Sequence, residues 1–129
     1  MNLHPLICVS DVEASSRWYR QLLGLQSGHG GVEYERLNAG DRLVLQLHRW
    51  EVEHHHGPLG DPALRPYGNG VLLWFELEDF DAAVQRAEAM RVDTTRPRFL
   101  SENGNWEHWL HDPDGYTVVL TSPLPGGNQ

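Results

Sequence analysis

The sequence predicts an α+β fold made of two copies of one strand–helix–strand–strand–strand unit. Residues 3–14 and 71–82 run in parallel at an offset of 68, about half of the 129-residue chain. Each copy is a strand-like run followed by an aspartate, an apolar residue, an acid and an alanine. A stripe of apolar residues at helical spacing follows each aspartate. A repeat of this length indicates two copies of one supersecondary unit.

The first copy begins with a strand over residues 3–9. Asp11 is placed to cap a helix over 12–23, and Gly24 is suited to end it. Residues 27–31 and 38–41 have turn composition. Further strands are expected near 26–27, where the signal is faint, and at 34–37 and 43–47.

The second copy repeats this order. A strand over 71–77 leads to Asp79, which is placed to cap a helix over 80–91. Residues 112–115, Asp-Pro-Asp-Gly, have the composition of a tight turn. The remaining strands are expected near 94–100, 105–111 and 116–121.

The chain length predicts a single domain over 1–129. A loop as long as the one between the two modules is usually a lid, a binding loop or a linker. His54, His55 and His56 in this loop are either a metal-binding tract or part of a solvated lid. The expected divisions are a first module over 1–48, the connecting loop over 49–69, a second module over 70–122 and a tail over 123–129.

Charge and composition exclude several classes of partner. The net charge is −8 and no basic run exists, so we expect no nucleic acid partner. No apolar stretch approaches the length of a membrane span, and Ser10-Asp11 interrupts the first apolar run before a signal peptide could form. The single cysteine, Cys8, excludes an internal disulfide and fits a reducing compartment. We therefore expect a cytoplasmic protein.

Four motifs in order carry a resemblance to a known family. They are Val-Ser-Asp-Val-Glu-Ala-Ser at 9–15, Trp-Tyr at 18–19, Leu-Leu-Gly-Leu at 22–25 and Asp-Pro-Asp-Gly-Tyr at 112–116. The set resembles the vicinal-oxygen-chelate superfamily, which includes glyoxalase I, extradiol dioxygenases and bleomycin-resistance proteins. The resemblance implies paired βαβββ modules that form a cup-shaped, mostly antiparallel sheet with the helices outside. It also implies a homodimer.

Strand alternation then predicts which side chains face the cup, because residues two apart share a face. Glu107 is the strongest candidate for a ligand-binding residue. It lies between two tryptophans in the sequence, where a carboxylate is costly to bury without a partner. The alternative is a structural ion pair between Glu107 and Arg96 or Arg98. The predicted ligand-binding residues are His4, Gln46, His48, Trp74, Glu107 and Trp109.

The resemblance implies that metal-dependent relatives take ligands from four equivalent strand positions, here His4, Gln46, Leu72 and Val119. Two of these residues are aliphatic, and a catalytic divalent site needs at least three protein donors. We therefore expect no metal at these positions. A divalent metal held by His4 and Gln46 with His48 or Glu107 stays possible as an alternative.

Two functions remain open. The first is a metal-free protein, similar to bleomycin-resistance proteins, that binds a small aromatic or cationic molecule in the cup. Trp74 and Trp109 would stack on this ligand, and Glu107 would favour its positive charge. The second is a metal-dependent lyase or dioxygenase with an atypical metal site. A cup without a known ligand is the third reading.

Overall fold

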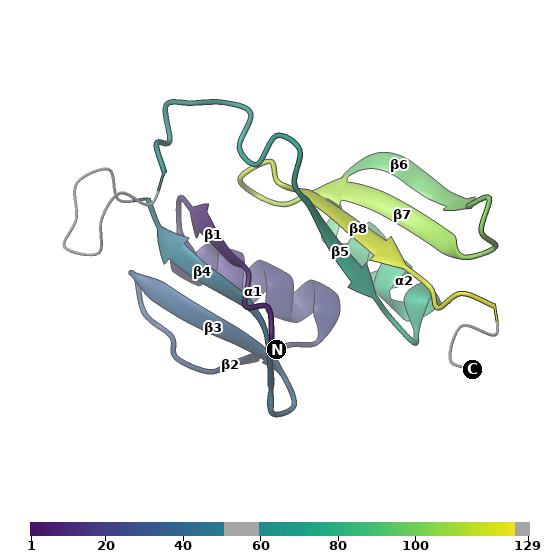
Figure 1. Cartoon of the computed structure of the whole chain (residues 1–129), viewed down its shortest axis with the longest axis horizontal. Helices are drawn as coiled ribbons and strands as arrows, with labels where there is room; N and C mark the ends of the chain where they lie inside the picture. The colour runs from purple at the N-terminus through teal and green to yellow at the C-terminus, as the bar shows by residue number, and fades with distance from the viewer. Residues whose placement is uncertain (51–59, 126–129) are drawn as a thin grey trace. The chain divides into compact units, whose positions relative to one another are not determined.

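The computed structural model describes residues 1–50 and 60–125, and the chain divides into two compact units, residues 1–65 and 66–129 (Figure 1). The described residues form two helices and eight strands, with the strands in two four-stranded sheets. Each unit follows the order strand, helix, strand, strand, strand. The α+β class and the twofold βαβββ order expected from the repeat are therefore confirmed.

Unit 1 has the sheet order β1-β4-β3-β2, with β1 parallel to β4 and the other pairs antiparallel. Strand β1 begins at Leu6 rather than at residue 3. Pro5 has no N–H to donate to a ladder, although its carbonyl accepts a hydrogen bond from the Gln46 N–H at 2.9 Å. His4 thus precedes the strand on which it was predicted. The elements are β1 (Leu6–Val9), α1 (Val12–Leu23), β2 (Gln26–Ser27), β3 (Tyr34–Ala39) and β4 (Arg42–Arg49).

Unit 2 has the sheet order β5-β8-β7-β6, again with one parallel pair, β5 with β8. The predicted tight turn between β7 and β8 is held by Asp112, whose side chain accepts hydrogen bonds from the N–H groups of Asp114 and Tyr116, both at 2.9 Å. Gly115 adopts a positive φ of 90° in this turn. The elements are β5 (Leu72–Glu76), α2 (Phe80–Met90), β6 (Asp93–Leu100), β7 (Trp106–His111) and β8 (Thr117–Thr121).

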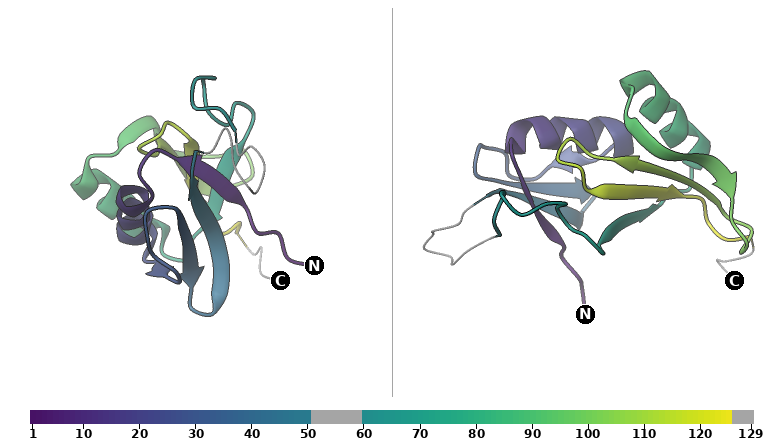
Figure 2. Two further views of the ribbon diagram at one scale, coloured as in Figure 1. Left: turned by 90° about the vertical axis from the view of Figure 1, so that its left-hand side faces the viewer. Right: turned by 90° about the horizontal axis from the view of Figure 1, so that it is seen from above.

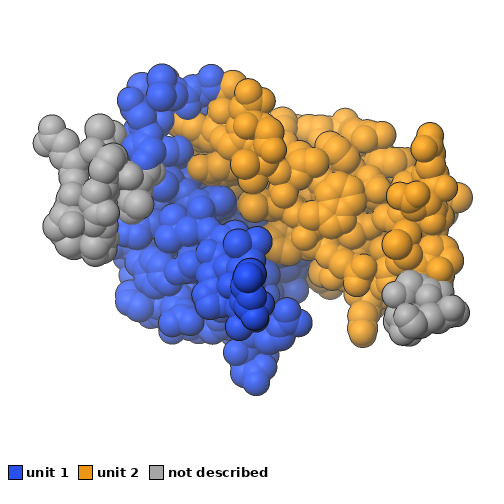
Figure 3. Space-filling model, viewed as in Figure 1, with its two compact units in different colours: residues 1–65 blue, residues 66–129 orange. Residues whose placement is uncertain are grey.

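The helix of each unit covers one face of its own sheet (Figure 2). The apolar side chains on that face form a separate core in each unit. Figure 3 shows the outer surface of the described parts of unit 1 in blue and of unit 2 in orange. The opposite face of each sheet is not covered by the unit's own helix, and we call it the open face. Neither helix in the described part of the chain is long and apolar enough to cross a membrane. Buried core residues include Val9, Tyr19, Leu22, Leu37 and Leu47 in unit 1, and Ala83, Ala87, Leu110, Val118 and Leu120 in unit 2.

Candidate functional site

The open faces of the two sheets carry five of the six predicted ligand-binding residues, Gln46 and His48 in unit 1 and Trp74, Glu107 and Trp109 in unit 2. Leu6 lies beside Gln46 in unit 1, and Trp74, its repeat equivalent, lies beside Val119 in unit 2. In the next register position, Tyr34 lies opposite His48 in unit 1, and Glu107 lies opposite Thr121 in unit 2. The pairing therefore agrees with the predicted equivalence of Gln46 and Val119. The predicted ligand-binding residues therefore form one group in each unit.

The group in unit 1 is a hydrogen-bonded set around Gln46. The Tyr34 hydroxyl donates to Gln46 Oε1 at 2.5 Å, and Gln46 Nε2 donates to the backbone carbonyl of His4 at 3.1 Å. His48 is buried, its Nδ1 lies 2.8 Å from the carbonyl oxygen of Arg49, and its ring centroid lies 6.2 Å from that of Tyr34. The sequence does not fix which face of the sheet Tyr34 occupies, because the irregular residues before β3 hide the phase of that strand.

The donors at the four family positions do not fit a divalent metal. Leu72 and Val119 have no donor atom, and Gln46 Oε1 already accepts the Tyr34 hydroxyl. Within residues 1–50 and 60–125, no three His, Cys, Asp or Glu side chains lie close enough together to hold a metal ion. Residues His54, His55 and His56, which could add donors, lie outside the described residues. Of the four positions, only His4 and Gln46 carry a side chain with a donor atom, which is fewer than the three protein donors of a catalytic divalent site.

The group in unit 2 is built around a buried carboxylate. Glu107 on β7 is 9% exposed, and its Oε1 accepts a hydrogen bond from Trp109 Nε1 at 2.9 Å. The rings of Trp74 and Trp109 meet edge to face, with centroids 6.1 Å apart and planes at 79°. Trp74 remains 48% exposed. Trp109 thus orients the carboxylate, and Trp74 offers the accessible ring.

The ion pair considered for Glu107 does not form among the described residues. Arg98 instead pairs with Asp81, with Nη1 and Oδ1 2.6 Å apart. The Arg96 guanidinium lies 4.8 Å from the centroid of the Trp109 ring. Both arginines are thus engaged elsewhere, and the partner of the Glu107 carboxylate is the neutral indole N–H.

A cavity of about 250 Å³ opens beside this carboxylate. Trp109 is not among its lining residues, so it contributes to the site through Glu107. The Asn105 amide donates to Thr121 Oγ1 at 2.6 Å, which joins the segment before β7 to the end of β8. The sequence missed Asn103, Asn105, Thr121 and Ser122, because the turn before β7 and the end of β8 meet only in the folded sheet. The cavity is lined by Trp74, Glu76, Asn103, Asn105, Glu107, Thr121, Ser122 and Leu124.

Comparisons with known proteins agree with this architecture. The family model described as "Glyoxalase/Bleomycin resistance protein/Dioxygenase superfamily" matches residues 3–120. No curated protein matches the chain. A protein of unknown function from Agrobacterium tumefaciens str. C58 has a similar structure, with 25% identity, a TM-score of 0.75, and coverage of 96% of this chain and 95% of that one.

Two further solved structures share the fold at lower identity. A lactoylglutathione lyase from Agrobacterium tumefaciens is 18% identical with a TM-score of 0.70, over 95% of this chain and 92% of that one. A bleomycin resistance determinant encoded on the transposon Tn5 is 18% identical with a TM-score of 0.69, over 95% and 97%. Since the family model covers nearly the whole chain and both βαβββ units are present, this chain belongs to the glyoxalase/bleomycin resistance protein/dioxygenase superfamily.

Proposed function

We propose that this protein binds a small cationic molecule with an aromatic part at the unit 2 cavity, without a catalytic metal. The observation that carries the proposal is the Glu107 carboxylate. It is buried, it has no cationic partner among the described residues, and it lines a cavity beside the exposed ring of Trp74.

Burying a carboxylate is costly unless a charge or hydrogen bonds compensate it. The indole N–H of Trp109 satisfies one oxygen of Glu107, and no hydrogen bond from a described residue reaches the other oxygen. A ligand cation in the cavity would supply the missing positive charge. The carboxylate therefore favours cationic over neutral ligands.

The aromatic residues support the same ligand class. The Trp74 ring lines the cavity, and a cation over a tryptophan face gains roughly 0.5–2 kcal/mol. Arg96 already lies over the Trp109 ring, so Trp74 is the ring open to a ligand. The cavity volume of about 250 Å³ is slightly below the usual range for ligand pockets, which favours a small ligand.

Tryptophan fluorescence tests the proposal directly. The probes are benzyltrimethylammonium, an aromatic cation, and benzyl alcohol, its neutral comparison. We expect saturable quenching by a cationic probe and much weaker binding of benzyl alcohol.

Variants then assign the effect to the site. Glu107→Gln keeps the shape and removes the charge, so binding of the cation should weaken roughly tenfold while the free energy of unfolding changes little. Glu78→Gln, an exposed acid of the same unit, is the matched control and should leave binding unchanged. A large loss of stability without loss of binding would show that Glu107 is a structural acid. Equal binding of the cation and benzyl alcohol would contradict the proposed ligand class.

The metal-free part of the proposal has its own test. Elemental analysis of protein purified without a histidine tag should find no stoichiometric divalent metal. One metal ion per chain that is lost in His4→Ala would overturn this part and favour the lyase or dioxygenase alternative. The variant His55→Ala/His56→Ala separates weak uptake by the histidine tract from binding at His4.

Gln46 and His48 stay predicted ligand contacts in unit 1. Their own hydrogen bonds, to Tyr34 and Arg49, are the competing structural explanation. Gln46→Ala would weaken probe binding if Gln46 contacts the ligand. An effect on stability alone would assign Gln46 to the sheet.

A further inference from the structure

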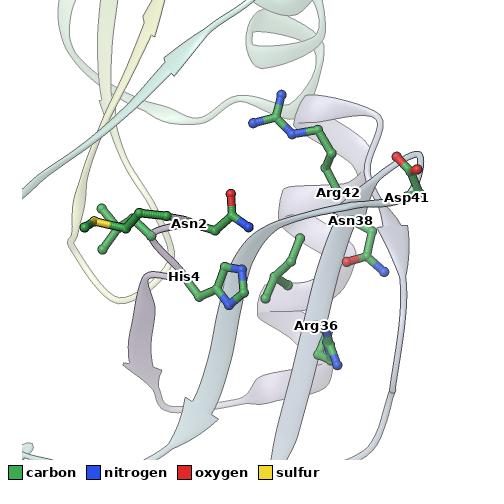
Figure 4. A pocket seen from close by; sticks show the side chains of 9 residues that line it. Asn2, His4, Arg36, Asn38, Asp41 and Arg42 are labelled. Carbon is green, nitrogen blue, oxygen red and sulfur yellow. The ribbon is translucent and has the colours of Figure 1, made fainter.

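Unit 1 contains a second cavity, which is separate from the cavity that carries the proposed function. Its volume is about 610 Å³, within the usual range for ligand pockets. The N-terminal segment and the β3–β4 hairpin form its walls, as Figure 4 shows. Its lining consists of Met1, Asn2, Leu3, His4, Arg36, Asn38, Asp41, Arg42 and Leu43.

Two arginines without an acidic partner set the character of this cavity. The chain has 18 acidic side chains and ten basic ones, and all ten are arginine. Arg36 on β3 and Arg42 on β4 nevertheless form no ion pair with any acid of the described segments. In Figure 4 the Arg42 guanidinium points away from Asp41, the one acid among the described lining residues. The lining is thus net positive in a chain of net charge −8.

Arginine is suited to one class of ligand. Its planar guanidinium donates two parallel hydrogen bonds to a carboxylate or a phosphate. The amides of Asn2 and Asn38 line the same cavity and can donate further hydrogen bonds. Leu3 and Leu43 add an apolar wall beside these donors.

We propose that this unit 1 cavity binds a small molecule through a carboxylate or phosphate group, with Arg36 and Arg42 as its principal contacts. The proposal goes beyond the cation site of unit 2 and shares no residue with the lining of that cavity. Failure of either proposal leaves the other standing.

Titration calorimetry with sodium benzoate and with inorganic phosphate, at constant ionic strength, tests the anion site. We expect saturable binding of at least one anion, and the stronger of the two identifies the group that the cavity prefers. Arg36→Gln and Arg42→Gln should each weaken this binding roughly tenfold. Arg17→Gln removes the same charge from an exposed position on α1 outside the cavity and should change it little.

An NMR titration of the full chain keeps the test independent of whether the variants fold. The Nε–Hε signals of Arg36 and Arg42 should shift on addition of the binding anion, and the Arg17 signal should not. No saturable binding of either anion would overturn the proposal. Equal weakening by Arg17→Gln, or equal shifts of all arginine signals, would also overturn it, because both indicate general charge attraction.

Discussion

Glu35 shows how a single buried carboxylate organises a segment of unit 1. It is 2% exposed, and its oxygens accept hydrogen bonds from the hydroxyls of Ser16 and Ser27 and from the N–H groups of His29, Gly30 and Arg36. Burial raises the pKa of this carboxyl, but the hydrogen bonds together lower it by more than burial raises it. The pKa of Glu35 therefore lies below its ordinary value of 4.5. The carboxylate thus joins α1 and the 27–30 segment to β3.

Replacing Glu35 tests this role. Glu35→Gln should reduce the free energy of unfolding at neutral pH by about 1–3 kcal/mol, because charge-assisted hydrogen bonds become neutral ones. Since the folded pKa is lowered, the contribution of Glu35 is present above about pH 4.5 and is lost as pH falls through the folded pKa. Urea unfolding at neutral and acid pH measures both effects. Glu33→Gln, an exposed acid paired with Arg49, is the control, and an equal loss there would contradict the assignment.

His108 makes unit 2 sensitive to pH in a higher range. Its Nδ1 accepts a hydrogen bond from the backbone N–H of Arg98 at 3.1 Å, and this requires the imidazole to be neutral. Burial lowers the pKa of His108 below its ordinary value of 6.5; the charge of Glu88 opposes this shift and the charge of Arg98 adds to it. Protonation therefore favours the unfolded chain.

The expected result is a loss of stability as pH falls below about 6.5 toward the lowered folded pKa. His108→Asn places an oxygen near the position of Nδ1 and cannot take up a proton in this range. The urea midpoint of this variant should therefore depend less on pH than that of the parent chain. Parallel pH profiles of the two proteins would rule out His108 as the titrating group.

At the scale of elements, the two helices begin with the same capping arrangement. Asp11 accepts a hydrogen bond from the Ala14 N–H, and Asp79 accepts one from the Ala82 N–H, both at 3.0 Å. Each of Asp11→Ala and Asp79→Ala should cost about 1 kcal/mol of stability, because a helical N–H loses its partner. Asp→Asn at each position retains an acceptor and should cost less, as measured by thermal unfolding. Equal losses in the Ala and Asn variants would show that charge rather than capping matters.

At the scale of the whole molecule, we predict a homodimer. Each four-stranded sheet has two edge strands, β1 and β2 in unit 1 and β5 and β6 in unit 2. Leu6 and Trp74, at equivalent positions on the two open faces, are 40% and 48% exposed. Sedimentation at micromolar concentration should therefore report twice the chain mass of 14.7 kDa. A single species with the mass of one chain would contradict this prediction.

The sequence by itself determined the two units, because the information is local. The strand–aspartate–helix pattern recurs at an offset of 68, and each aspartate caps the helix that directly follows it. Strand alternation also placed Gln46 with His48, and Glu107 with Trp109, since residues two apart share a face. The start of β1 was misplaced, because apolar periodicity does not register the missing N–H of Pro5.

Only the tertiary structure decided what these side chains contact. Glu107 accepts its hydrogen bond from Trp109, whereas Arg98 lies beside Asp81 and Arg96 lies over an aromatic ring. Sequence spacing does not encode this choice of partners. Both cavities join segments that are distant in the chain, such as His4 with Arg42, and Asn105 with Thr121. Contacts of this kind depend on sheet register and turn geometry, so they become visible only when the strands are assembled.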